Sequence, residues 1–462
     1  MKATDITAPP EGRVNKLYFA AWRWHFYAGL FVIPFLTVLA VTGMAMLWIA
    51  WIDGRDGERT AVFPQDIVQP VSVQADAAVA AIPDGTLKQY VAPRTSDVAA
   101  LFRVDSGGDA TMVAVDPYSA EVIETFPRRS GWYDFVDGIH SDLMLGVTGD
   151  RMLETAASLA LVLIATGLYM WWPRDAGWRR AFVPTFGRGR ALWKSLHGVV
   201  GIWLSLFLVF FLISGLSWAG IWGGKMVQAW SQFPAEKWNE VPLSDETHAS
   251  LNHDRREVPW ALEQTPLPAS GSDAGVAGVD AGPVTIDTVD RLAREIGFDA
   301  RYQLNVPRSA TGVWTLSRDS MNTDSTDPMS DRTVHVDQYS GKILADVRFD
   351  DYSIAGKAMA VGIALHMGTL GLWSVLANTI ICLSVLFLCV SSVVLWWKRK
   401  PAHAGRLSAP PMPKELPLWQ GAVLVGLAVS MAFPMAGIAL LCVLAVDAFI
   451  LSWLPSLRYR LT

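Results

Sequence analysis

Charged residues are scarce in this chain. Asp, Glu, Lys and Arg make up 18% of the 462 residues, whereas 52% are hydrophobic and 21 are tryptophan. Together with a mean hydropathy of +0.28, this composition excludes an ordinary soluble protein and predicts an integral membrane protein. The net charge of −5 argues against a protein that binds nucleic acid.

Cysteine is also rare, and nucleotide-binding motifs are missing. The three cysteines, Cys382, Cys389 and Cys442, lie in apolar runs and form no Cys-x-x-Cys pair, so the sequence supports neither a zinc site nor a thioredoxin-like motif. No Gly-x-Gly-x-x-Gly follows a strand-like run, and no Walker A motif occurs. A redox enzyme with this sequence would therefore have to take its electrons from a quinol or from a separate cytoplasmic donor.

Long uncharged runs predict the membrane spans. A span needs about 20 apolar residues. Gly368 and Gly371 are expected to break the longest run and to separate a short helix from the span after them. Pro434 interrupts a further run, 418–454, which predicts a hairpin of two short spans or a single kinked span. The four main predicted spans are 26–52, 155–173, 195–224 and 373–397.

Basic residues cluster before the first span, in the loop 175–194 and after Trp397. Because basic loops stay in the cytoplasm, two large polar segments, 53–132 and 225–352, are placed on the outer side. Each reads as a helix followed by short alternating strands. Their closing hairpins match, with Val-Ala-Val-Asp-Pro-Tyr-Ser-Ala-Glu-Val-Ile at 113–123 and Val-His-Val-Asp-Gln-Tyr-Ser-Gly-Lys-Ile-Leu at 334–344. The unit of span, outer module and span therefore occurs twice.

Four histidines occupy matched positions in the two halves. His25 precedes Thr42-Gly43 and His197 precedes Ser214-Gly215, in both cases with 18 residues from His to Gly. His140 and His366 precede Trp171-Trp172 and Trp396-Trp397 by 31 and 30 residues. A single membrane histidine is often only a hydrogen-bonded core residue, but a matched set favours a functional role. The tryptophans are predicted to be interfacial anchors.

The other histidines carry weaker signals. His335 aligns with Ala114 of the first hairpin and is predicted to be a surface residue. His248 and His253 are placed in a polar loop, and His403 in the tail after the fourth span.

With these features, the chain resembles the PepSY-associated transmembrane family. The Asp-x-Tyr-Ser hairpins resemble a PepSY domain, and the His-bearing helices that end in Trp-Trp plus basic residues resemble the family's membrane part; the likeness covers about 14–400. The family includes inner-membrane ferric-siderophore reductases of Gram-negative bacteria that bind b-type haem. The resemblance implies a bacterial inner-membrane α-helical bundle with two periplasmic α+β PepSY-like domains. The matched positions in the sequence add the internal duplication, and the C-terminal hairpin is an extra element that the resemblance does not cover.

The expected organisation follows the chain in order. It comprises a cytoplasmic N-terminus with the first span (1–52), a first PepSY-like domain (53–132), a face helix with the second span (133–174), a basic loop (175–194), the third span (195–224), a second PepSY-like domain with a flexible insert (225–352), a face helix with the fourth span (353–400), a linker (401–417) and the hairpin (418–462).

Two b-type haems are the expected cofactors. His25 with His197 would hold one haem iron, and His140 with His366 the other, because two imidazoles must approach one macrocycle from opposite sides. Arg23 and Lys194, close to two of these histidines, are expected to pair with haem propionates.

The predicted function is a di-haem oxidoreductase that passes electrons to a ferric siderophore or another ferric chelate in the periplasm and releases Fe(II). Two alternatives stay open, a membrane-anchored PepSY regulatory or binding protein and a His-lined metal transporter.

Overall fold

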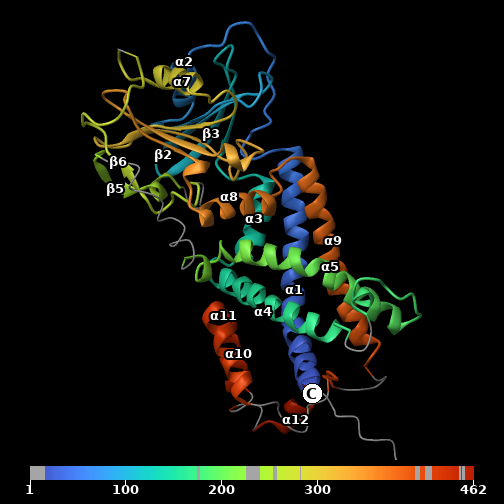
Figure 1. The fold of residues 1–462 in the computed structure, drawn as a ribbon. Coiled ribbons are helices and arrows are strands. Elements are labelled where there is room, and N and C mark those ends of the chain that lie inside the picture. Colours follow the sequence, from blue (N-terminus) through green and yellow to red (C-terminus); the bar gives the residue numbers. More distant parts are fainter. Residues whose placement is uncertain are drawn as a thin grey trace, which may run out of the picture. The chain divides into compact units, whose positions relative to one another are not determined.

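A computed structural model describes residues 16–173, 177–224, 240–252, 258–280, 282–400, 406–410, 419–446, 449 and 453–461. Contacts within the chain divide it into two compact units. The first unit comprises residues 1–40, 147–216 and 383–462, and its described elements are helices. The second unit comprises residues 41–146 and 217–382 and carries the described strands (Figure 1).

Four described helices are long and apolar enough to cross a membrane, so the chain is a membrane protein. They correspond to the four main predicted spans, but all four begin earlier than predicted, by one to ten residues. α1 starts at Lys16, and its 37 residues make it about 55 Å long, more than the hydrocarbon layer requires. These helices are α1 (Lys16–Ile52), α4 (Val147–Trp171), α5 (Arg190–Leu216) and α9 (Leu372–Trp397).

α4 begins eight residues before the run predicted from its lack of charge, because its first turns contain charges that pair with one another. Arg151 Nη1 lies 2.6 Å from the Asp150 carboxylate and 3.2 Å from that of Glu154. Glu154 is only 2% exposed, so the ion pair compensates a buried carboxylate and lets the helix continue through the charged segment. Further along, Ala160 of α4 packs with Val32 of α1 and Leu212 of α5 in an apolar core.

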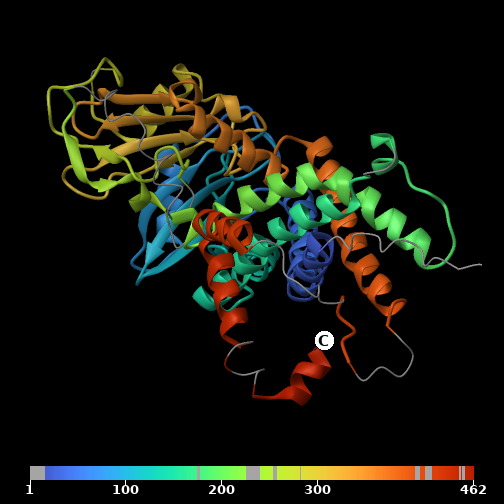
Figure 2. The same cartoon turned by 60° about the horizontal axis from the view of Figure 1, so that its bottom comes forward.

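The C-terminal part of the first unit contains a tight pair of helices, α10 (Trp419–Ala432) and α11 (Pro434–Ala445). A Cβ added at Gly426 of α10 would lie 3.8 Å from Leu440 of α11, so the two helices pack side by side (red in Figure 2). Side-by-side packing is the arrangement of a helical hairpin, and the crossing of the membrane by this hairpin in two short spans stays a prediction. A last helix, α12 (Pro455–Leu461), follows.

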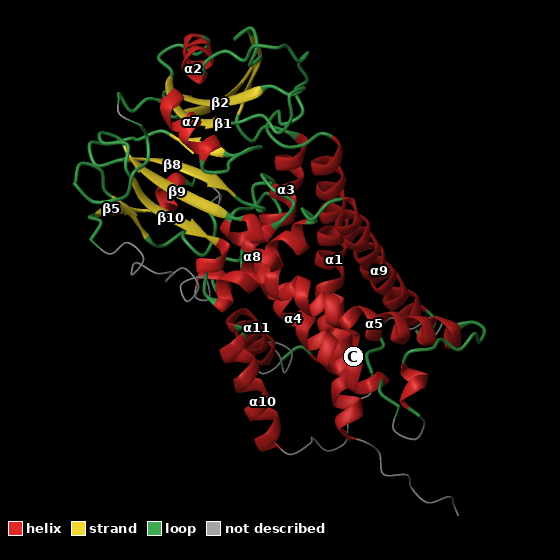
Figure 3. Ribbon diagram, turned by 45° about the horizontal axis from the view of Figure 1, so that its top comes forward, coloured by secondary structure: helices red, strands yellow, loops and turns green. Residues whose placement is uncertain are grey.

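The second unit is organised around one eight-stranded antiparallel sheet (Figure 3). Its order, β10-β9-β8-β7-β1-β2-β3-β4, places two four-stranded meanders edge to edge. Each of the two predicted PepSY-like modules contributes one meander, and β1 pairs with β7, which removes an exposed edge from each meander and makes one continuous sheet. The strands are β1 (Thr86–Val91), β2 (Ala100–Ser106), β3 (Asp109–Val115), β4 (Val122–Pro127), β7 (Gln303–Asn305), β8 (Val313–Arg318), β9 (Arg332–Asp337) and β10 (Ile343–Arg348).

Two short helices, α2 (Val71–Ala80) and α7 (Ile286–Glu295), cover one face of this sheet (Figure 1). Apolar residues of both helices and of the strands of both meanders form one core there. Thr285 caps α7 by accepting a hydrogen bond from the Thr288 backbone N–H, which fixes where this helix begins. A second, two-stranded sheet consists of β5 (Leu243–Thr247) and β6 (Pro266–Pro268).

Two further helices of the second unit carry predicted site residues. α3 (Trp132–Asp142) contains His140, and α8 (Ile354–Met367) contains His366. Gly368 has a φ of +70° and ends α8 in a left-handed cap, and Gly371 has a φ of +92°. The predicted break between a short helix and the fourth span therefore lies at these two glycines. Short 3-10 turns occur at Trp178–Ala181, His248–Leu251, Pro328–Ser330 and Phe349–Asp351.

Candidate functional site

The four helix histidines form two pairs, one in each unit. His25 of α1 and His197 of α5 belong to the first unit, where they are close enough for their charges to interact. His140 of α3 and His366 of α8 belong to the second unit and interact in the same way. The structure therefore brings His25 close to His197 and His140 close to His366. These are the pairs that the matched positions in the sequence predicted.

His25 is held through one ring nitrogen. Its Nδ1 lies 3.0 Å from Thr166 Oγ1 and 3.1 Å from the Leu163 carbonyl oxygen, both on α4. The neighbouring Gly167 leaves room for the ring, because a Cβ there would be only 3.2 Å from His25 Cε1. No described residue forms a hydrogen bond with the other nitrogen, Nε2.

His197 has a comparable arrangement. Its Nδ1 lies 2.7 Å from Ser391 Oγ on α9, and no described residue forms a hydrogen bond with its Nε2. In both histidines of this pair, Nδ1 contacts polar atoms of the fold, whereas Nε2 has no hydrogen-bond partner among the described residues. An imidazole in this state is suited to bind a metal ion through Nε2.

In the second unit, His140 Nδ1 lies 2.8 Å from Thr42 Oγ1, near the end of α1. A Cβ at Gly43 would be 3.2 Å from His140 Cε1, the same spacing as between Gly167 and His25. His366 lies in the last turn of α8, where the Asn378 side chain donates to the backbone carbonyls of residues 365 and 366. Asn378 thereby fixes the end of the helix that carries this histidine.

Two Thr-Gly pairs contact histidines of the candidate site. Thr42-Gly43, which follows His25 by sequence, packs against His140, and Thr166-Gly167 packs against His25. Sequence comparison missed the roles of Thr166 and Ser391. The available signal was that each hydroxyl lies five residues before a Trp-Trp pair in an otherwise apolar helix.

The two basic residues expected near haem propionates behave differently from each other. Arg23 donates from Nη1 to the Pro410 carbonyl and from Nη2 to the Tyr27 hydroxyl, at 3.3 Å for the latter. The Lys194 side chain forms no hydrogen bond or ion pair with a described residue. Lys194 therefore has its ammonium available for an anionic group, whereas Arg23 already has partners.

The first tryptophan of each Trp-Trp pair forms a hydrogen bond with the segment that follows its helix. Trp171 Nε1 donates to the Ala181 carbonyl, and Trp396 Nε1 donates to the Leu407 carbonyl, each at 2.9 Å. These bonds join the end of α4 and the end of α9 to the chain about ten residues further on. The second tryptophan of each pair, Trp172 or Trp397, is exposed, as an interfacial anchor would be.

Two histidines of the sheet region were placed wrongly from the sequence. His335, predicted on the surface, and His248, predicted in a polar loop, are both fully buried and lie 2.9 Å apart between their Nε2 atoms. His335 Nδ1 also contacts Thr315 Oγ1, and His248 Nδ1 contacts the Thr265 carbonyl. All four ring nitrogens are therefore engaged. His335 is buried because the strand register of β9 places it opposite Thr315 of β8, inside the sheet. His253 and His403 lie outside the described residues.

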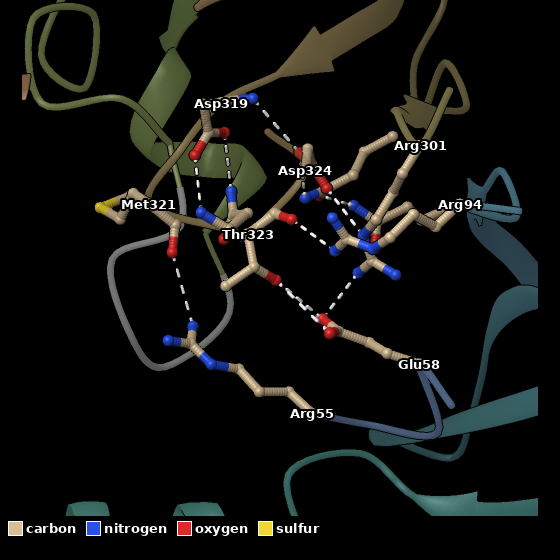
Figure 4. A network of polar contacts seen from close by, with 11 residues as sticks. Arg55, Glu58, Arg94, Arg301, Asp319, Met321, Thr323 and Asp324 are labelled. Carbon is tan, nitrogen blue, oxygen red and sulfur yellow. Dashed lines mark hydrogen bonds and ion pairs between the residues drawn. The ribbon is translucent and has the colours of Figure 1, made fainter. Parts of the chain in front are cut away.

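A buried ionic network fixes the loop that follows β8 (Figure 4). Arg301 bridges the carboxylates of Asp324 and Glu58, each at 2.9 Å. Arg94 donates to the Thr323 carbonyl, and Arg55 to the Met321 carbonyl. The network connects the segment after α1 with this loop inside the second unit.

Comparison with known families agrees with these features. A family model described as the PepSY-associated TM region matches residues 22–399, which is most of the chain. No curated protein gives a significant match to the chain. The matched region includes the four helices long enough to cross a membrane, the eight-stranded sheet and all four paired histidines. The chain therefore belongs to the PepSY-associated transmembrane family.

Proposed function

We propose that this protein is a di-haem oxidoreductase of the bacterial inner membrane that passes electrons outward to a ferric siderophore. The observation that carries the proposal is the state of His25 and His197. Each has its Nδ1 bonded to the fold and its Nε2 without a hydrogen-bond partner among the described residues, and the two lie on different helices of one unit. This donor set fits bis-histidine ligation of haem iron.

The proposed holding residues are His25 with His197 for one b-type haem and His140 with His366 for the other. Haem, when bound, supplies one-electron redox chemistry, which matches the single electron that separates Fe(III) from Fe(II). The histidines hold and orient the cofactor, and Lys194 has an ammonium suited to a propionate. Arg23 serves less well in that role, because Pro410 and Tyr27 already use its guanidinium.

The proposed direction is outward. Basic residues flank the first span and fill the loop 175–194, which favours a cytoplasmic side for both, and the sheet is then periplasmic. A polar acceptor such as a ferric siderophore would meet the protein on the periplasmic side, near the pair His140 and His366. A quinol or a cytoplasmic donor would supply electrons at the pair His25 and His197.

Purified protein from haem-replete cells provides the test. The pyridine haemochrome assay is expected to give about two b-type haems per chain, one for each histidine pair. Dithionite-reduced protein, freed of excess reductant, should be reoxidised by ferric siderophores, with Fe(II) appearing in a colorimetric chelator. Protein without haem would contradict the proposal and favour a regulatory or binding protein. Haem bands that no ferric chelate reoxidises would leave an oxidoreductase with another acceptor.

A further inference from the structure

Three of the four paired histidines contact a hydroxyl through Nδ1. Thr166 Oγ1 is 3.0 Å from His25, Ser391 Oγ is 2.7 Å from His197, and Thr42 Oγ1 is 2.8 Å from His140. The hydroxyls belong to α4, α9 and α1, so three different helices supply the same contact. Their recurrence at both pairs requires an explanation beyond the ordinary use of Thr and Ser in membrane helices.

The proton positions can be deduced for the first pair. Thr166 Oγ1 donates its single proton to the Val162 carbonyl at 2.7 Å, so it can only accept from His25. The Leu163 carbonyl, the other neighbour of His25 Nδ1, is also an acceptor. The Leu163 carbonyl can only accept, so His25 carries its proton on Nδ1, which leaves the lone pair on Nε2. Ser391 Oγ lies 3.0 Å from the Leu388 carbonyl, and when its hydroxyl donates there it accepts from His197 Nδ1 in the same way.

We propose that Thr166, Ser391 and Thr42 are positioning residues that fix the ring orientation and the Nδ1–H tautomer of His25, His197 and His140 and thereby set the redox potential of each haem. This inference rests on the proposed haem-binding function. A hydrogen bond donated from Nδ1 makes the Nε2 ligand more basic, which favours the ferric over the ferrous state. Removing the acceptor therefore raises the midpoint potential of the haem concerned.

The geometry also orders the effects. His197 has Ser391 as its only described hydrogen-bond partner, whereas His25 keeps the Leu163 carbonyl at 3.1 Å if Thr166 is lost. Ser391→Ala is therefore expected to shift the potential more than Thr166→Val. Both changes should act on the same haem, while Thr42→Val should act on the other one.

Matched controls exist on the same helices. The Ser392 hydroxyl donates to the Leu388 carbonyl at 2.8 Å, and the Thr155 hydroxyl donates to the Arg151 carbonyl at 2.7 Å, but neither contacts a histidine. Ser392→Ala and Thr155→Val remove a helix hydroxyl without touching a ligand. Thr166→Ser retains the acceptor and is the rescue variant.

The experiment is a spectroelectrochemical titration of both haems in the purified full-length protein, with electron paramagnetic resonance of the ferric state. We expect Ser391→Ala and Thr166→Val to raise one potential, Thr42→Val to raise the other, and Ser392→Ala, Thr155→Val and Thr166→Ser to match the wild type. Wild-type haem binding with unchanged potentials in Ser391→Ala and Thr42→Val would overturn this inference alone. A wild type without haem would overturn both the inference and the proposed function.

Discussion

The helices and the sheet of this protein use the ring nitrogens of histidine in two different ways. In the sheet, His248 and His335 use all four ring nitrogens in hydrogen bonds within the fold. In the helices, His25 and His197 use only Nδ1. The sheet pair therefore has no ring nitrogen left for a ligand, whereas Nε2 of His25 and of His197 has no hydrogen-bond partner among the described residues.

The largest expected difference between helix and sheet histidines is in haem content after one histidine of each kind is replaced. His197→Ala and His25→Ala are each expected to abolish the same haem, because bis-histidine ligation fails when either side is lost. His140→Ala and His366→Ala should abolish the other haem, and His335→Leu should abolish neither. Haem content and difference spectra measure the outcome. A shared loss in His25→Ala and His140→Ala, with His197→Ala sparing that component, would show that the pairing follows the halves instead.

Arg301→Met tests whether the sheet region can be weakened without disturbing the helix histidines. It leaves the buried carboxylates of Asp324 and Glu58 without their cation. Loss of one partner from a buried ion pair costs about 3–5 kcal/mol of unfolding free energy. Thermal or denaturant unfolding should detect this loss, and haem content per folded protein should stay at the wild-type value. The more exposed pair between Arg348 and Asp346 offers a control, since Asp346 keeps Arg332 as a partner and Arg348→Met is expected to cost less than about 1 kcal/mol.

The pH dependence of the unfolding free energy gives a further test of the buried pair of His248 and His335. Burial lowers the pKa of His248 from 6.5 to about 4, and burial next to His248 lowers the pKa of His335 well below its usual range. The unfolded chain binds these protons below about pH 6.5 and the folded one does not, so their contribution is present above pH 6.5 and is lost as pH falls toward 4. The loss is roughly 3 kcal/mol for His248 alone.

Buried carboxyl groups change the unfolding free energy with pH in the opposite direction. The effect of the histidine pair must therefore be measured as a difference between the wild type and a variant without the pair. Burial raises the pKa of Asp319, Asp324 and Asp331 to about 7, and their contribution to stability falls as pH rises toward 7. Unfolding midpoints between pH 5 and 7.5 should be compared for the wild type and for His248→Leu/His335→Leu. The double variant is expected to lose less stability on acidification. Equal losses in the two proteins would mean that the pair does not resist protonation.

The smallest expected effect is steric. In Gly167→Ala, the new Cβ would lie 3.2 Å from His25 Cε1, so the ring must move by a few tenths of an ångström. We expect haem to be retained with a small shift of its ferric resonance signal, and the same at the other haem for Gly43→Ala. Gly201→Ala, where the added Cβ meets nothing within 4 Å, is the control and should leave both signals unchanged.

The sequence predicted the parts of this arrangement that depend on composition and repetition. The four spans follow from apolar runs, and the histidine pairing follows from matched positions in the two halves. The hydroxyl partners escaped prediction because Thr and Ser in apolar helices usually bond only to their own helix. The pair of His248 and His335 escaped because it joins residues 87 positions apart and depends on strand register. The β1–β7 pairing was missed because β7 has only three residues.

That β1–β7 pairing has a consequence for biosynthesis. β1 ends at Val91 and its partner begins at Gln303, so the ribosome must add about 210 residues before the sheet can close. At 5–20 residues per second, the edge of β1 stays unpaired for about 10–40 s. An open edge strand is a site for misassembly with other chains. The first meander therefore keeps an unpaired edge at β1 until the second meander has been synthesised.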